Sequence, residues 1–193
     1  MTNRLVLSLA LTGLVVAAPA AADVLTPVGV NASSTFNNGF YTPQNLINGS
    51  GLSGGLHGGF FGDMWSTDQG VPYSAINVVF DLGGLYDLDG ASIWQFNYAD
   101  GVQLPGVIST LDRGVKDFAL SISTDGVTYS QVLTDTLARG TGQPLAAQDF
   151  AFDGVARYVR LNVLNNYAQG TIYERDYATG LSEVRFTGAA AVP

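Results

Sequence analysis

The sequence contains no cysteine, few charged residues and no segment with the periodicity of an amphipathic helix. The absence of cysteine excludes disulfides, thiol catalysis and thiolate metal sites, so stability must come from core packing, with or without a bound cation. Basic residues number only 8 against 16 acidic ones, and they form no Lys/Arg cluster that could neutralise phosphates. These absences argue against nucleic acid or an anionic membrane as the partner.

The N-terminal segment has the features of a cleavable signal peptide. A short basic start, residues 1–4, precedes an apolar run, Leu5–Ala18, that is too short for a comfortable bilayer crossing. Small residues at 20–22 match the pattern that signal peptidase cleaves, so we expect removal of residues 1–22 and export of the protein, secreted or at the cell surface. The mature chain then carries about nine net negative charges.

The rest of the chain predicts an all-β fold. The full sequence has 47% hydrophobic residues, enough for one core, and apolar residues in the rest of the chain alternate with polar ones as in half-buried strands. The alternating segments are 76–82, 117–123, 158–163 and 183–186.

Turn and loop residues separate these segments. The run Ser123–Tyr129 predicts a tight hairpin turn, and two longer polar or glycine-rich stretches, Asn48–Gly62 and Asn165–Gly180, predict loops. We expect one domain over residues 23–188, followed by a short tail at 189–193. Trp65 and Trp94 are expected to be core residues.

Several fragments together resemble the discoidin, or coagulation factor V/VIII type C (F5/8 type C), family. They occur in the family's order, and they are Asn45–Gly49, Met64–Ser66, Val79–Gly83, Phe118–Tyr129, Ala156–Leu161 and Leu181–Phe186. The resemblance implies an antiparallel jelly-roll β-sandwich of the galactose-binding-like kind, similar to family 32 carbohydrate-binding modules, in which loops at one end bind the ligand. The ending Ala-Ala-Ala-Val-Pro also resembles the start of the PEP-CTERM sorting signal of exported bacterial proteins. Either the chain is truncated at this point or the match is accidental.

The same resemblance implies a structural calcium ion. Calcium prefers six to eight oxygen ligands from carboxylates and carbonyls. The positions that match the family's site are the Asn45 carbonyl, Asn48, Ser50, Asp63 and Glu183. Asn48 lacks the charge that the family usually has there, and the loop from Gly49 to Asp63 is longer than usual. The alternative interpretation is a plain turn at Asn48-Gly49 and a strand-edge carboxylate at Glu183.

A sugar site needs an aromatic face for stacking and a few side chains that bind hydroxyls. The predicted loops offer such residues, and the candidates are His57, Phe60, Asn97, Tyr98, Arg113, Asn166 and Tyr167. The alternatives are that His57, in a loop, is simply solvated and that Arg113 pairs with Asp117.

Catalysis finds little support in the sequence. No pair of opposed carboxyls stands out among turn-forming Asp residues, and a Ser-His-Asp arrangement would have only His57 and no nucleophile elbow. We therefore predict a non-enzymatic domain that binds carbohydrate, such as an extracellular polysaccharide or a cell-surface glycan. The alternatives, in order, are a structural or adhesive surface protein that binds proteins or itself, and an unrecognised hydrolase.

Overall fold

The computed structural model describes residues 23–101, 109–171 and 178–192, so the expected signal peptide and Pro193 lie outside the described residues. No helix in these ranges is long and apolar enough to cross a membrane. The strands are β1 (Asp23–Leu25), β2 (Gly29–Ala32), β3 (Leu52–Ser53), β4 (Leu56–His57), β5 (Trp65–Ser66), β6 (Asn77–Gln95), β7 (Asp117–Ser123), β8 (Ser130–Thr136), β9 (Leu145–Ala146), β10 (Gln148–Val163) and β11 (Gly180–Ala190). Short 3-10 helices are η1 (Pro43–Leu46), η2 (Phe61–Asp63), η3 (Tyr73–Ala75) and η4 (Thr110–Arg113).

The predicted antiparallel β-sandwich is confirmed. The period-two segments lie within strands, except for Ile76, which directly precedes β6. Burial alternates clearly at the start of β6, where Val78 and Phe80 have no exposed surface, whereas the four successive residues Phe118–Ser121 of β7 are all buried. The expected tail differs in one respect, because β11 continues to Ala190 through pairing with Tyr86 of β6.

Two long strands, β6 and β10, belong to both layers of the sandwich. Their first pairing segment, around Phe80 and Val159, continues through β2 on one side and through β7 and β8 on the other. Their second, around Ile93 and Gln148, continues through β11 to β1. The layers meet in the core, where the rings of Phe80 and Phe186 pack edge to face with centroids 5.5 Å apart.

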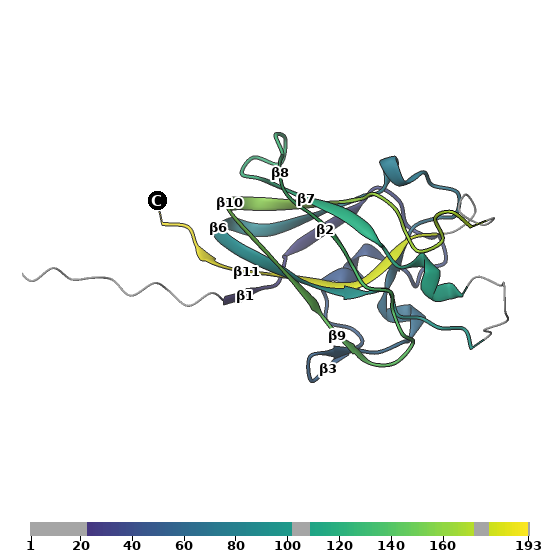
Figure 1. Ribbon diagram of the computed structural model, residues 1–193. Coiled ribbons are helices and arrows are strands. Elements are labelled where there is room, and N and C mark those ends of the chain that lie inside the picture. Colours follow the sequence, from purple (N-terminus) through teal and green to yellow (C-terminus); the bar gives the residue numbers. More distant parts are fainter. Residues whose placement is uncertain (1–22, 102–108, 172–177, 193) are drawn as a thin grey trace, which may run out of the picture.

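Both long strands bend at the same end of the molecule. The β6–β10 register shifts between Ala156 and Tyr158, and Gly83, in the bent part of β6, has a φ of 80° that favours glycine. Figure 1 shows β10 doubling back at the end that also carries the C terminus. The end of β2, the end of β6 and the start of β7 therefore lie at the opposite end.

The predicted hairpin turn joins β7 to β8. The Asp125 carboxylate accepts hydrogen bonds from the backbone N–H groups of Val127 and Thr128 at 2.8 and 2.9 Å. This is the local side-chain hydrogen bonding that makes Asp a turn former.

Asp117 joins three segments at the start of β7. Its carboxylate accepts hydrogen bonds from Thr136 Oγ1 and Asn165 Nδ2, each at 2.6 Å, and its backbone N–H donates to Asn165 Oδ1 at 2.9 Å. The two side-chain hydrogen bonds hold the pKa of Asp117 below its ordinary value.

We predict that Asp117→Asn destabilises the fold by about 1–2 kcal/mol near neutral pH, because the carboxylate loses its donors. Since the pKa of Asp117 is lowered on folding, its contribution is present above the ordinary carboxyl pKa and is lost as the pH falls through the folded value. Urea unfolding across pH should therefore show a gap between wild type and D117N that narrows in acid. Asp153→Asn, at an exposed position, is the control, and a gap that does not change with pH would contradict the assignment.

Candidate functional site

Aromatic side chains gather at the end of the sandwich opposite the bends. Tyr41, Met64 and Phe96 form a small buried cluster separate from the main core, with Phe36, Phe61 and Tyr98 packed against it. Phe61 is central, since its ring centroid lies 4.8 Å from that of Phe60, 5.4 Å from that of Phe40, 5.6 Å from that of Tyr98 and 5.9 Å from that of Tyr41. Phe40 and Phe60 remain 53% and 58% exposed, so this cluster presents aromatic surface to solvent.

A cavity of about 340 Å³ opens beside these rings. Its lining combines aromatic and polar side chains, and the lining residues are Phe36, Asn38, Tyr41, Phe61, Tyr98, Asp100, Thr110 and Arg113. They come from four segments: the loop after β2, the Phe60–Asp63 turn, the segment that follows β6, and η4.

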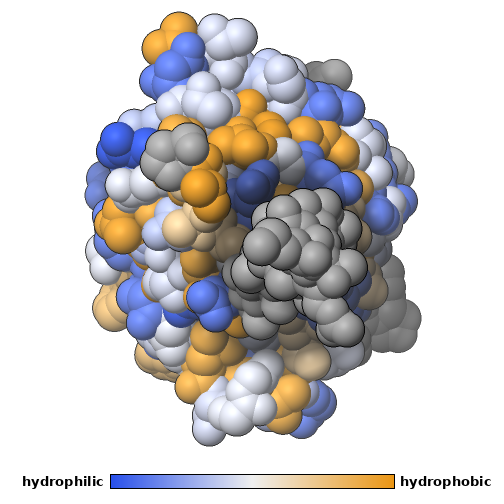
Figure 2. Space-filling model, turned by 90° about the vertical axis from the view of Figure 1, so that its left-hand side faces the viewer, coloured by the Kyte–Doolittle hydropathy of each residue, from blue (hydrophilic) through white to orange (hydrophobic). Residues whose placement is uncertain are grey.

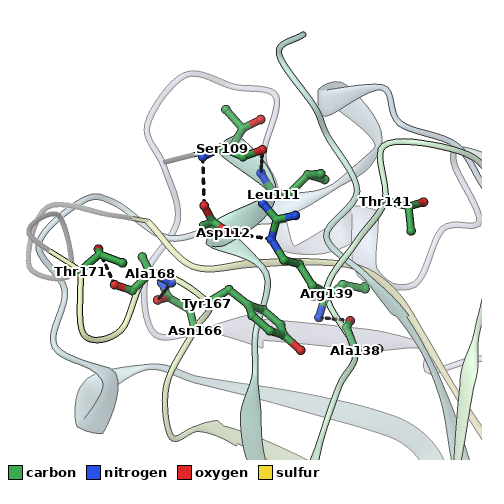
Figure 3. Close-up of polar contacts among 12 residues, drawn as sticks. Ser109, Leu111, Asp112, Ala138, Arg139, Thr141, Asn166, Tyr167, Ala168 and Thr171 are labelled. Carbon is green, nitrogen blue, oxygen red and sulfur yellow. Dashed lines mark hydrogen bonds and ion pairs between the residues drawn. The ribbon is translucent and has the colours of Figure 1, made fainter. Parts of the chain in front are cut away.

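The polar wall is held by the capping of η4. Ser109 Oγ accepts a hydrogen bond from the N–H of Leu111 at 3.2 Å, and Asp112 accepts one from the N–H of Ser109 at 2.9 Å. Arg139 Nε forms an ion pair with Asp112 Oδ1 at 2.6 Å. Figure 3 shows these contacts around η4, which orients Arg113 at its C-terminal end.

Two contacts connect Arg113 and η4 to the aromatic wall. Arg113 forms a side-chain hydrogen bond with Tyr41, whose pKa is raised by burial and lowered in part by that guanidinium. Thr110 Oγ1 donates to the Tyr98 carbonyl at 2.7 Å and accepts from the Asp100 N–H at 3.1 Å. Among the described residues, the wall of the cavity thus contains one cation, Arg113, and one carboxylate, Asp100.

Asn45, in η1, holds the aromatic segments together. Its buried Nδ2 lies 2.7, 3.0 and 2.8 Å from the carbonyl oxygens of Phe40, Gly62 and Met64. Those carbonyls belong to the two loops that carry the exposed rings, so one carboxamide sets the position of both.

Three of the seven predicted ligand residues meet at this site. Tyr98 and Arg113 line the cavity, and exposed Phe60 packs on Phe61 beside it. The side chains of the other four, His57, Asn97, Asn166 and Tyr167, make contacts within the protein instead.

The structure uses these four residues to fix loops. His57 is fully buried, and its Nδ1 lies 2.9 Å from the Gly58 carbonyl. Asn97, also buried, binds Gln143 O through Nδ2 and accepts from Thr141 N and Gly142 N. Asn166 accepts from Tyr73 and Ala168, and Tyr167 donates to the Leu137 carbonyl. Figure 3 shows Asn166 and Tyr167 beside the segment that carries Arg139.

Comparison with known proteins now decides the family. The F5/8 type C domain model matches residues 29–176, which is most of the chain. The chain belongs to the F5/8 type C domain family. No curated protein sequence shows significant similarity to it.

Solved structures share this fold at low sequence identity. CBM32 of AlyQ in complex with 4,5-unsaturated mannuronic acid has a TM-score of 0.54 and 21% identity, covering 85% of this chain and 97% of that one. CpGH89CBM32-5 from Clostridium perfringens, in complex with GalNAc-beta-1,3-galactose, has 0.56 and 14%, covering 82% and 93%. A pectin-binding carbohydrate-binding module has 0.56 and 15%, covering 88% and 96%.

Other similar structures are larger proteins. Truncated AlyQ with CBM32 and alginate lyase domains has a TM-score of 0.57 and 20% identity, with 89% of this chain covered, but the F5/8 type C domain spans only 34% of that chain. The same fold therefore occurs as one domain of a larger protein that also carries an alginate lyase domain.

Most of the aromatic residues that line the cavity of this F5/8 type C domain were not predicted from the sequence. Phe36 and Tyr41 were not among its candidates, although the loop after β2 carries three aromatic residues within the short run from Phe36 to Tyr41. That density of rings in an otherwise polar loop was the available signal.

The residues matching the family's calcium site are connected, but through their own hydrogen bonds. Asn48 donates to Asn45 Oδ1 at 3.3 Å and accepts from Ser50 N at 2.8 Å, and Gly49 N donates to Glu183 Oε2 at 3.1 Å. Asp63 lies nearby, with its Cβ 3.0 Å from where a Cβ on Gly51 would stand.

The Arg185 guanidinium places a positive charge next to Glu183. Arg185 forms an ion pair with Glu183 Oε1 and donates to the Ile47 carbonyl at 2.7 Å. Within the described ranges, no three His, Cys, Asp or Glu side chains gather as a metal centre. Arg185 thus places a positive charge at Glu183, one of the five matching positions, which disfavours a second cation there. The Ser50 hydroxyl and Glu183 Oε1 are buried without a hydrogen bond of good geometry, and the contact of Glu183 Oε1 is the ion pair with Arg185. Bound calcium stays a prediction of the resemblance.

We predict that Asn45→Ala lowers the free energy of unfolding by about 2 kcal/mol or more, because the buried carbonyls lose their shared donor. The near-ultraviolet circular dichroism of the aromatic cluster should weaken as well. Gln44→Ala, at the exposed neighbouring position of η1, is the control. If N45A and Q44A unfolded alike in urea, the central role of Asn45 would be wrong.

Proposed function

We propose that this F5/8 type C domain is an exported, non-catalytic domain that binds carbohydrate in the cavity beside Phe61. The observation that carries the proposal is the exposed pair of rings, Phe40 and Phe60, that both pack on Phe61 at the edge of a cavity with a polar wall. The ligand would be an extracellular polysaccharide or a cell-surface glycan.

The two kinds of wall match the two kinds of surface on a sugar ring. A pyranose has an apolar face that stacks on an aromatic ring, and hydroxyls at its edge that need directional hydrogen bonds. Arg113 and Asp100 supply hydrogen-bond donors and acceptors among the residues that line the cavity. Because the polar groups are anchored by η4 and Thr110, the site is largely formed before a ligand arrives.

The relatives support this class of ligand. The structures of similar fold include modules in complex with an unsaturated mannuronic acid, with GalNAc-beta-1,3-galactose, and one that binds pectin. Their ligands are both acidic and neutral, so the array described below contains both kinds.

The carboxyls support a binding role over a catalytic one. Among the described residues, Glu183 is the carboxyl with a raised pKa: burial raises it to about 7, and Arg185 opposes the shift. Glu183 is not among the residues that line the aromatic cavity, so it does not supply an acid there. The cavity itself offers Asp100 without an opposed carboxyl among its described lining residues.

Figure 2 views the molecule from the end opposite the cavity. Hydrophobic and hydrophilic residues intermingle on that face, whereas the exposed rings at the cavity are contiguous through Phe61. If an adhesive contact with another protein were the function, the same two rings would be its anchor.

We predict that Phe60→Ala and Phe40→Ala each weaken glycan binding by about tenfold or more, because an exposed aromatic anchor carries a large share of the binding energy. A glycan array with neutral and uronic-acid sugars identifies the ligand, and calorimetry then measures the variants. Leu85→Ala removes an apolar side chain of similar exposure, 49%, at the bent end and should bind normally. Silence on every glycan would overturn the proposal and favour an adhesive role.

A further inference from the structure

The turn Ile47–Ser50 is held to β11 by an ion pair that lies outside the proposed sugar site. Glu183 and Arg185 are two residues apart on β11, so they lie on the same face of the strand, while Val184 points into the core. Glu183 is fully buried, and the side chain of Arg185 is 13% exposed. Two charges have therefore been taken out of water at the base of a loop.

The polar contacts of Glu183 and Arg185 run to each other and to the turn. One oxygen of Glu183 accepts the Gly49 N–H at 3.1 Å, and the other faces Arg185. The second guanidinium nitrogen donates to the Ile47 carbonyl at 2.7 Å. The guanidinium thus joins a carboxylate on the strand to a carbonyl in the turn, and these are the oxygen types that calcium would join.

The backbone leaves room for this cation. A Cβ on Gly49, whose φ is 73°, would stand 3.4 Å from Arg185 Nη2, so the guanidinium lies directly against the turn. A divalent cation sharing the same oxygens would meet a fixed like charge at close range. A divalent cation that used Glu183 as a ligand would compete with Arg185 for this carboxylate.

We propose that the Arg185 guanidinium is a built-in counter-cation, which fastens the Ile47–Ser50 turn to β11 in the place that the family resemblance gives to calcium. The turn follows directly on η1, whose Asn45 holds the loops that carry Phe40 and Phe61. The scaffold of the aromatic cavity is then independent of calcium. This inference concerns the scaffold, so it stands or falls separately from sugar binding.

The first test uses the wild-type protein. Thermal unfolding is measured with millimolar calcium chloride and with a chelator, and calorimetry titrates calcium chloride alone. We expect the same Tm in both conditions and no saturable heat. A bound ion that favours the folded state would raise Tm by several degrees at saturation, and that result would overturn the proposal whether or not any variant folds.

Variants of Arg185 provide the second test. Arg185→Met keeps the aliphatic stem and removes the charge, so we expect a lower Tm that calcium now partly restores. Arg185→Lys keeps the charge with fewer donors, and we expect an intermediate Tm without a calcium response. Arg157→Met, which removes the exposed ion pair with Asp81 elsewhere, is the matched control and should show no rescue. An unchanged Tm in R185M would contradict the proposal.

Discussion

The pairing of β6 with β10 is the constraint on which the rest of the structure depends. Each strand pairs with the other in both layers, and each bends once, at the same end. Because both bends lie at one end of the sandwich, the ends of the strands and the loops that follow them lie at the other end. The aromatic cavity is a consequence of this arrangement: its walls come from segments far apart in sequence that the two bent strands bring side by side.

The period of the sequence was enough to find the strands, since burial on one face repeats at every second residue in any half-buried strand. The bends of β6 and β10 could not be predicted from this period. Gly83 and Gly154 stand next to Asp or Gly, and such pairs look the same whether they separate two strands or turn one strand between layers. Only the long-range pairing of β6 with β10 distinguishes the two cases.

The candidate site, too, could be predicted from the sequence only in part. Polar loop residues were reasonable sugar ligands, and the sequence carries no sign of whether a loop amide faces the solvent or its own backbone. Asn97 and Asn166 face the backbone, because irregular loops leave N–H and C=O groups that buried amides must satisfy. Arg113 and Tyr98 reach the cavity because η4 and Thr110 hold them there, through contacts that no local pattern encodes.

The contrast between Arg185 and a bound ion has a physical consequence for an acidic protein without disulfides. A guanidinium is planar and forms directed hydrogen bonds, so it fixes both the distance and the orientation of the turn relative to β11. A calcium ion imposes weaker directionality and dissociates when its concentration falls. If Arg185 takes the place of the ion, as proposed, the position of the turn does not depend on the calcium concentration, and Glu183 has its counter-charge within its own strand. The acid and amide residues that resemble the family's calcium site would then help to fix the turn without an ion.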